Sequence, residues 1–231
     1  MPPESRERSW AAFGVDTSMT AVSVFCTGYD AITDTVRGPF WGEIRWSPED
    51  DYFHRLGAAV KAADLIYDIG KDLWVRDHDD IYIAIEEPVH YGAIERKITS
   101  WMKQQCEVAG AFKGGIVNQG YLNIYEINNA SWKKTLRQEG VQFIVNPKGA
   151  TAAEKRVNSW KNKWVVKDWA MRAFGMPDFP DLVKNREGAK IPRPATGFGA
   201  NAKPEQPNDI YDAAAICAWM CNEIDAIRAA A

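Results

Sequence analysis

The segment WAAFGVDTSMTAVSVFCTG (10–28) consists of two apolar runs on either side of a short polar stretch. The first run ends in Asp16, and the second is rich in residues that favour strands. Residues 17–20 between them are therefore expected to form the turn of an antiparallel hairpin. A third strand is expected over 37–46, so the N-terminal part of the chain predicts a sheet with a carboxylate at the end of its first strand.

The rest of the chain alternates between helix and strand patterns. A long helix is expected to begin with Ser47 as its N-cap and Pro48 at its first position, and to end at Gly70. The other elements are expected as strands over 81–86 and 121–127, and as helices over 93–112, 128–136, 156–174 and 208–230. Residues 177–207 are dense in Pro, Gly, Lys and Asn without periodicity, which is typical of a long loop. Together these elements predict an α/β domain in which helices flank a five-stranded mixed sheet.

The composition, with 231 residues, 46% hydrophobic and 26% charged, is that of one globular domain. No apolar run reaches the roughly 18 residues that a membrane span needs. Residues 1–10 lack the apolar core of a signal peptide, so a cytoplasmic protein is expected. Cys217 and Cys221 lie four residues apart and could chelate a metal. No second Cys/His pair lies at zinc-site spacing, so free thiols are favoured over a zinc site.

Charge is unevenly distributed along the chain. Residues 133–203 contain 15 Lys and Arg against 6 Asp and Glu, a local charge of +9. The remainder contains 13 basic and 25 acidic residues, a local charge of −12. This asymmetry predicts a basic surface for an anionic partner such as nucleic acid. Two solvated faces of opposite sign are the alternative.

Four carboxylates fall where an open α/β sheet places its functional site. Asp16 and Glu86 end the first and fourth expected strands, and Asp209 and Asp212 lie three residues apart on one face of the last helix. Converging carboxylates repel one another unless hard cations such as Mg²⁺ or Mn²⁺, which prefer oxygen ligands, lie between them. Two such ions can activate water for phosphoryl displacement. Taken singly, each acid is also ordinary for a turn, a strand end or a helix start.

Three motifs, in this order, resemble those of the RuvC family of Holliday junction resolvases, within the ribonuclease-H-like superfamily. They are FGVDTSMTAVSV (13–24), YIAIEEPVHY (82–91) and NDIYDAAAICAW (208–219). The elements between them follow the same order, and the length of the chain resembles the bacteriophage members. The resemblance implies a ribonuclease-H-like fold in a single domain over 1–231, with a basic loop insertion at about 177–207.

The resemblance also implies a function, namely that of a crossover junction endodeoxyribonuclease that resolves four-way junctions and possibly other branched DNA. It implies that Asp16, Glu86, Asp209 and Asp212 hold two Mg²⁺ or Mn²⁺ ions. A homodimer is expected, because two symmetric cuts are needed to resolve a four-way junction.

The resemblance assigns the metal to Glu86 and not to its neighbour Glu87. In the strand 81–86, Glu86 shares a face with Tyr82 and Ala84, whereas Glu87 falls on the opposite face. We therefore expect Glu86 to be essential for cleavage and Glu87 to be dispensable.

Further residues match positions that contact DNA in the family. Lys133 in WKKTL matches a basic residue beside the active site better than Lys134 does, and is expected to act on the scissile phosphate. An exposed helix lysine is the alternative explanation. Lys163 lies near another basic position, and His90 or Tyr91 could stack at the junction, although His90 is equally explained as a surface residue.

Two other functions remain open on the sequence alone. GVDTSMT (14–20) also resembles the first phosphate loop of actin-like and sugar-kinase folds, but these folds need a second domain and a glycine-rich adenosine motif. A non-catalytic protein that binds branched DNA is the other alternative, and it has no need for four converging carboxylates.

Overall fold

The computed structural model describes residues 8–18, 21–47, 50–70, 75, 80–88, 100–178, 182–184, 190–192 and 209–230. Its centre is a mixed five-stranded sheet in the order β3-β2-β1-β4-β5. Strands β1, β2 and β3 form an antiparallel meander, and β4 and β5 run parallel to β1. The strands are β1 (Trp10–Thr17), β2 (Ala21–Asp30), β3 (Thr35–Arg45), β4 (Ile81–Glu86) and β5 (Ile124–Ile127). The predicted α/β class and mixed sheet are confirmed.

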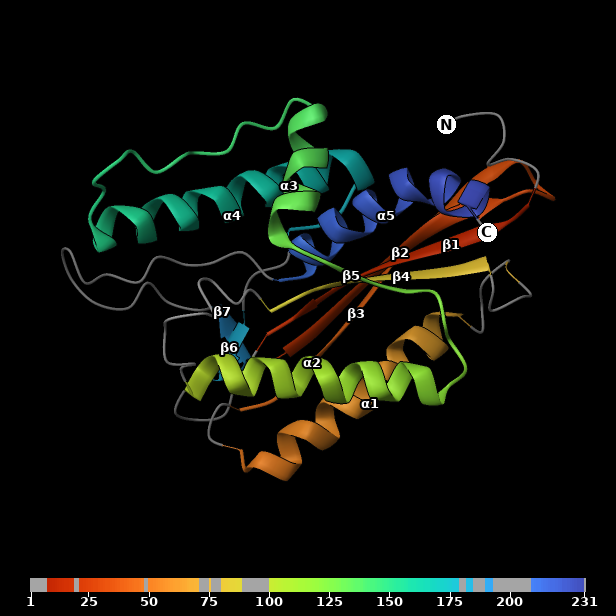
Figure 1. The fold of residues 1–231 in the computed structure, drawn as a ribbon, viewed down its shortest axis with the longest axis horizontal. Coiled ribbons are helices and arrows are strands. Elements are labelled where there is room, and N and C mark those ends of the chain that lie inside the picture. The colour runs from red at the N-terminus through yellow and green to blue at the C-terminus, as the bar shows by residue number, and fades with distance from the viewer. Residues whose placement is uncertain are drawn as a thin grey trace.

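Helices cover both faces of the sheet (Figure 1). Helices α1 (Tyr52–Gly70) and α2 (Ser100–Asn118) pack against each other on one face. The other face carries α3 (Asn129–Gln138), α4 (Ala152–Phe174) and α5 (Ile210–Ala230). The central strand β1 serves both cores, since Ala11, Phe13 and Val15 face α1 and α2 while Trp10 and Ala12 face α5. This alternation places Asp16 on the α5 side.

A close contact between β1 and α5 fixes the relative position of the two elements. A Cβ atom added to Gly14 would lie 2.1 Å from the backbone oxygen of Ala213 and 2.2 Å from the backbone nitrogen of Cys217. Only glycine therefore allows the helix to approach the strand this closely. The Cys217 thiol also donates a hydrogen bond to the carbonyl of Ala12 at 3.1 Å.

The predicted start of α1 was wrong. Asp51, and not Ser47, caps this helix, because the Oδ1 atom of Asp51 accepts a hydrogen bond from the His54 amide at 2.9 Å. The Ser47 amide instead donates to the side chain of Asp50 at 2.9 Å, within the turn before the helix. Pro48 lies outside the described residues.

Other boundaries also differ from those expected. Helix α4 begins at Ala152, because Thr151 and Glu154 form a capping box ahead of it. Helix α2 continues to Asn118, and residues 93–99 at its expected start lie outside the described residues. The predicted loop at 177–207 contains a short antiparallel hairpin of β6 (Leu182–Lys184) and β7 (Lys190–Pro192).

None of the four cysteines forms a disulfide, and Cys26 and Cys217 are buried. In the part of the chain that the structure describes, none of the helices combines the length and apolar character that a bilayer crossing requires.

Candidate metal centre

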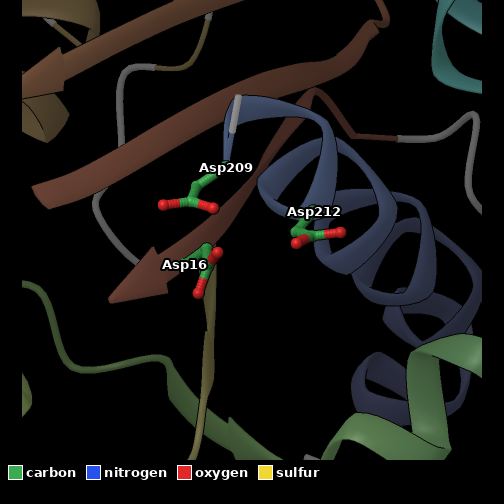
Figure 2. A group of neighbouring side chains, drawn as sticks. All are labelled: Asp16, Asp209 and Asp212. Atoms are coloured by element: carbon green, nitrogen blue, oxygen red, sulfur yellow. The ribbon is translucent and has the colours of Figure 1, made fainter. Parts of the chain in front are cut away.

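Three carboxylates converge where β1 ends and α5 begins. Asp16 comes from β1, Asp209 directly precedes α5, and Asp212 lies in the first turn of α5, as Figure 2 shows. One carboxylate oxygen from each residue lies within 4.8 Å of the corresponding oxygens of the other two. The Ala213 amide donates to the Asp209 carbonyl at 3.0 Å, so Asp209 lies at the N-terminal boundary of α5 and on the same side of the helix as Asp212.

The geometry and chemistry of these three groups fit a divalent cation. Ligand oxygens at about 2.0–2.1 Å from Mg²⁺ lie within about 4.2 Å of each other, so small side-chain movements would complete a coordination shell. Carboxylate oxygens are also the ligands that Mg²⁺ and Mn²⁺ prefer. The three residues Asp16, Asp209 and Asp212 could therefore hold such an ion.

Burial and neighbouring carboxylates disfavour the negative charge of Asp16. Burial raises the pKa of Asp16 well above its usual value, and the charges of Asp209, Glu86 and Asp212 raise it further. The ionised form of Asp16 is thus disfavoured until positive charge arrives.

Lys163 of α4 supplies part of that positive charge. Its Nζ atom donates to Asp209 Oδ1 at 2.8 Å and lies 3.2 Å from Asp212 Oδ2. Burial alone would lower the pKa of Lys163, but the neighbouring carboxylates, Asp212 foremost, outweigh it and raise the pKa well above its usual value. The DNA contact expected for Lys163 stays a prediction, and the structure places its ammonium group beside the carboxylates of Asp209 and Asp212.

Glu86 lies beside this cluster but its oxygens point to α3. Asn129 Nδ2 donates to Glu86 Oε1 at 2.8 Å, and Trp132 Nε1 donates to Glu86 Oε2 at 3.2 Å. Burial raises the pKa of Glu86, the hydrogen bond from Asn129 opposes this, and the charge of Asp212 adds to it. Direct coordination of a metal by Glu86 stays a prediction.

Glu86 and Glu87 differ in position as the alternation of the strand predicts. Tyr82 and Ala84 belong to the core under α5, while Ile83 and Ile85 belong to the core under α1 and α2. Glu86 therefore lies on the same face of β4 as Tyr82 and Ala84, whereas Glu87 is exposed.

Lys133 and Lys134 differ in burial, as Glu86 and Glu87 do. Lys133 is partly buried, with its Nζ 4.9 Å from the ring centre of Trp132. Burial lowers the pKa of Lys133, while the charges of Asp212 and Glu86 oppose that shift. Lys134 is exposed, and successive residues on a helix point about 100° apart. Lys133 is thus the lysine on the carboxylate side.

A groove of about 350 Å³ opens beside Asp212 between α3, α4 and the segment 141–150. Its lining is mostly polar and includes both lysines near the carboxylates. The lining residues are Asn129, Trp132, Lys133, Asn146, Ser159, Asn162, Lys163, Val166 and Asp212. His90 and Tyr91, the predicted stacking residues, lie outside the described residues.

Asn129 and Trp132 were not predicted from the sequence. They sit in the first turn of α3, directly after β5, which pairs with β4 next to Glu86. The sequence signal that could have found them is their position directly after β5, the strand that pairs with β4 and its terminal Glu86.

Comparison with known structures gives the fold. The structure of Thermus thermophilus RuvC has a TM-score of 0.54 and 13% identity, covering 94% of this chain and 96% of that protein. T. thermophilus RuvC in complex with Holliday junction substrate has a TM-score of 0.52, with the same identity and coverage. The fold is RuvC-like. No protein-family model and no curated protein sequence matches the chain. The predicted ribonuclease-H-like fold is confirmed by this RuvC-like structure.

Proposed function

We propose that the protein is a metal-dependent, structure-specific endonuclease that resolves four-way DNA junctions. The observation that carries this proposal is the convergence of Asp16, Asp209 and Asp212 at the end of β1 in a RuvC-like fold. Other branched DNA belongs to the same substrate class. The products are a 5′-phosphate and a 3′-hydroxyl, because water attacks phosphorus and the 3′ oxygen leaves.

Each residue of the site has a part in this reaction. Asp16, Asp209 and Asp212 hold the divalent cation, Mg²⁺ or Mn²⁺. When bound, such a cation would lower the pKa of a water molecule and offset negative charge on the phosphate. Glu86 adds negative charge and orients Asn129 and Trp132 of α3 through its two hydrogen bonds. The two-ion site implied by the family resemblance stays a prediction.

Lys133 is proposed to contact the scissile phosphate from the wall of the groove. Helix α4 and the C-terminal part of α3 lie within the strongly basic part of the chain, 133–203, which supports a DNA-facing surface. His90, Tyr91, Lys134 and the insertion at 177–207 are proposed as further DNA contacts. A single domain over 1–231, acting as a homodimer on branched DNA in the cytoplasm, completes the proposal.

Cleavage of a labelled four-way junction tests this function. We expect the wild type to cut the junction only when Mg²⁺ or Mn²⁺ is present, and Asp212→Asn to bind the junction without cutting it. A linear duplex of the same sequence is the control for structure specificity. Binding without metal-dependent cutting would favour the non-catalytic alternative, and ATP hydrolysis without DNA would favour the kinase-like one. Within the described residues, however, the main sheet is single and five-stranded, whereas actin-like kinases need two domains.

The two neighbouring glutamates provide a prediction with a built-in control. Glu86→Gln is expected to lose cleavage by at least about 100-fold, since it removes a charge beside Asp16 and places an amide opposite the donors Asn129 and Trp132. Glu87→Gln is expected to cut like the wild type, because Glu87 is exposed on the other side of the strand. Single-turnover rates on the junction measure both, and a reversed order of effects would refute the placement of the site.

A further inference from the structure

We propose that Asn129 and Trp132 of α3 are positioning residues, which hold the Glu86 carboxylate in the orientation that a divalent cation requires. This inference rests on the proposed function and on the predicted role of Glu86 as a metal ligand. It goes beyond both, because it assigns part of the affinity for metal to a helix that contributes none of the four acids of the site.

The chain topology brings the start of α3 to Glu86. In the parallel pair of β4 and β5, Glu86 lies opposite Ile127, and α3 begins two residues later at Asn129, with Asn128 as its N-cap. Asn129 and Trp132 are three residues apart, so they lie on the same side of the first turn. The N-terminal end of a helix also favours negative charge nearby. The first turn of α3 therefore offers Glu86 both side-chain donors and a favourable helix end.

The two donors bind different oxygens of the carboxylate. Asn129 Nδ2 lies 2.8 Å from Glu86 Oε1, and Trp132 Nε1 lies 3.2 Å from Glu86 Oε2. Each oxygen of an ionised carboxylate has two acceptor positions, so one on each oxygen remains for a cation. A donor on each side also restricts rotation of the carboxylate group. The two hydrogen bonds thus fix the ligand without occupying all of its acceptor positions.

The packing of α3 makes these donors a rigid support. Trp132 is only 2% exposed, and its ring packs edge-to-face against Phe143, with 6.4 Å between ring centres. Thr135 and Leu136 of the same helix are buried as well. These contacts anchor α3 in the core independently of Glu86. The two polar contacts are therefore available to position the carboxylate.

The charges of the site show why Glu86 needs such support. The negative charge of Asp212 acts against that of Glu86, and the charge of Glu86 in turn acts against that of Asp16. A Glu86 side chain without partners on α3 would lower its energy by rotating away from these acids. Hydrogen bonds to metal-ligating carboxylates generally hold such ligands in place, and their loss typically costs 10- to 100-fold in metal affinity or activity.

The affinity for Mn²⁺ tests the inference. The full-length protein is titrated with Mn²⁺, and the free ion is measured by electron paramagnetic resonance. We expect Asn129→Ala and Trp132→Phe each to weaken Mn²⁺ binding by about 10- to 100-fold. Trp132→Phe removes the indole N–H that donates to Glu86 but keeps an aromatic ring in the core.

Trp169→Phe is the matched control for Trp132→Phe. Trp169 is also buried, and its Nε1 atom donates to Glu139 Oε2 at 2.8 Å. The substitution therefore removes the same kind of indole–carboxylate hydrogen bond from a pair that includes none of the four acids. We expect Trp169→Phe to bind Mn²⁺ with the affinity of the wild type.

A double-mutant cycle shows whether Asn129 acts through Glu86. Once Glu86→Gln has removed the carboxylate, Asn129→Ala is expected to change Mn²⁺ affinity by no more than about twofold, because the group that it positions is gone. An undiminished loss in this background would mean that Asn129 acts by another route, which a general structural role predicts.

The outcomes separate this inference from the proposed function. Wild-type affinity in a folded Asn129→Ala, or an equal loss with and without the Glu86 carboxylate, would overturn the positioning role and leave the nuclease proposal intact. A wild type that binds no Mn²⁺ would instead contradict the metal-dependent function, and this inference with it. Asn129 is half-buried, so Asn129→Ala provides the reading if Trp132→Phe fails to fold.

Discussion

Asp16→Asn is expected to abolish metal-dependent cleavage and, in the absence of metal, to raise the melting temperature. The loss of activity should reach at least about 1,000-fold, because Asp16 lies at the point where the three carboxylates meet. The gain in stability has a separate cause. Burial and three neighbouring acids raise the pKa of Asp16, so its ionised form destabilises the folded chain. Asparagine removes that charge while keeping the size of the side chain.

The stability difference between the wild type and Asp16→Asn is expected to depend on pH. Below about pH 3.9 the carboxyl group is protonated in both the folded and unfolded states and carries no penalty. As the pH rises through the elevated pKa of the folded state, the wild type loses stability that Asp16→Asn retains. Each unit of pKa shift corresponds to about 1.4 kcal/mol, and about 1 kcal/mol changes Tm by about 2–4 °C in a chain of this size. Thermal unfolding in a chelator at pH 5 and pH 8 measures the difference, and an unchanged Tm at pH 8 would contradict it.

Gly14→Ala is expected to cause the largest loss of stability. The new methyl group would lie 2.1 Å from the Ala213 carbonyl oxygen and 2.2 Å from the Cys217 amide nitrogen. Both contacts are with backbone atoms of α5, which cannot rotate away as a side chain can. The helix must shift, at a cost of about 3 kcal/mol or more, and Asp212 shifts with it. We therefore expect a Tm lower by about 10 °C, or no folded protein, together with the loss of metal binding.

Gly114→Ala is the matched control for this substitution. Gly114 lies in the interior of α2, and a Cβ atom there would meet nothing within 4 Å. Alanine in an open helix position stabilises by about 1 kcal/mol relative to glycine, so this variant should melt slightly above the wild type. Equal Tm values for the two alanine variants would show that the contact between β1 and α5 is not restrictive.

The approximate position of the acids was predictable because it follows from local periodicity. Asp209 and Asp212 are three residues apart in a helical pattern, and Asp16 and Glu86 end strand patterns. Parallel pairing of β1 with β4 then places the ends of both strands at the same edge of the sheet. The distinction between Glu86 and Glu87 likewise needed only the alternation of a strand.

The polar contacts around the acids were not predictable in this way. Trp132 reaches Glu86 across 46 positions in the sequence, and Lys163 reaches Asp209 across the same separation. Lys163 was singled out only by its resemblance to a basic position of the family, and its two carboxylate partners were not predicted. Tryptophan and lysine are both common on helices that pack against a sheet, so neither residue type alone indicates these contacts. The start of α1 was predicted wrongly for another reason. Ser47 and Asp51 are both good N-cap residues, and only the structure shows that Asp51 accepts the hydrogen bond from the helix.

The dependence of the carboxylate cluster on α5 has a consequence for the protein during its synthesis. Chains grow from the N-terminus, so the whole sheet and α4 leave the ribosome before α5 does. A nascent chain that ends before residue 209 carries Asp16 and Glu86 but lacks both acids of α5, and so cannot assemble the three-carboxylate cluster. Incomplete translation products are therefore expected to be unable to cut DNA. Cleavage activity would arise only after α5 has packed against β1 at Gly14.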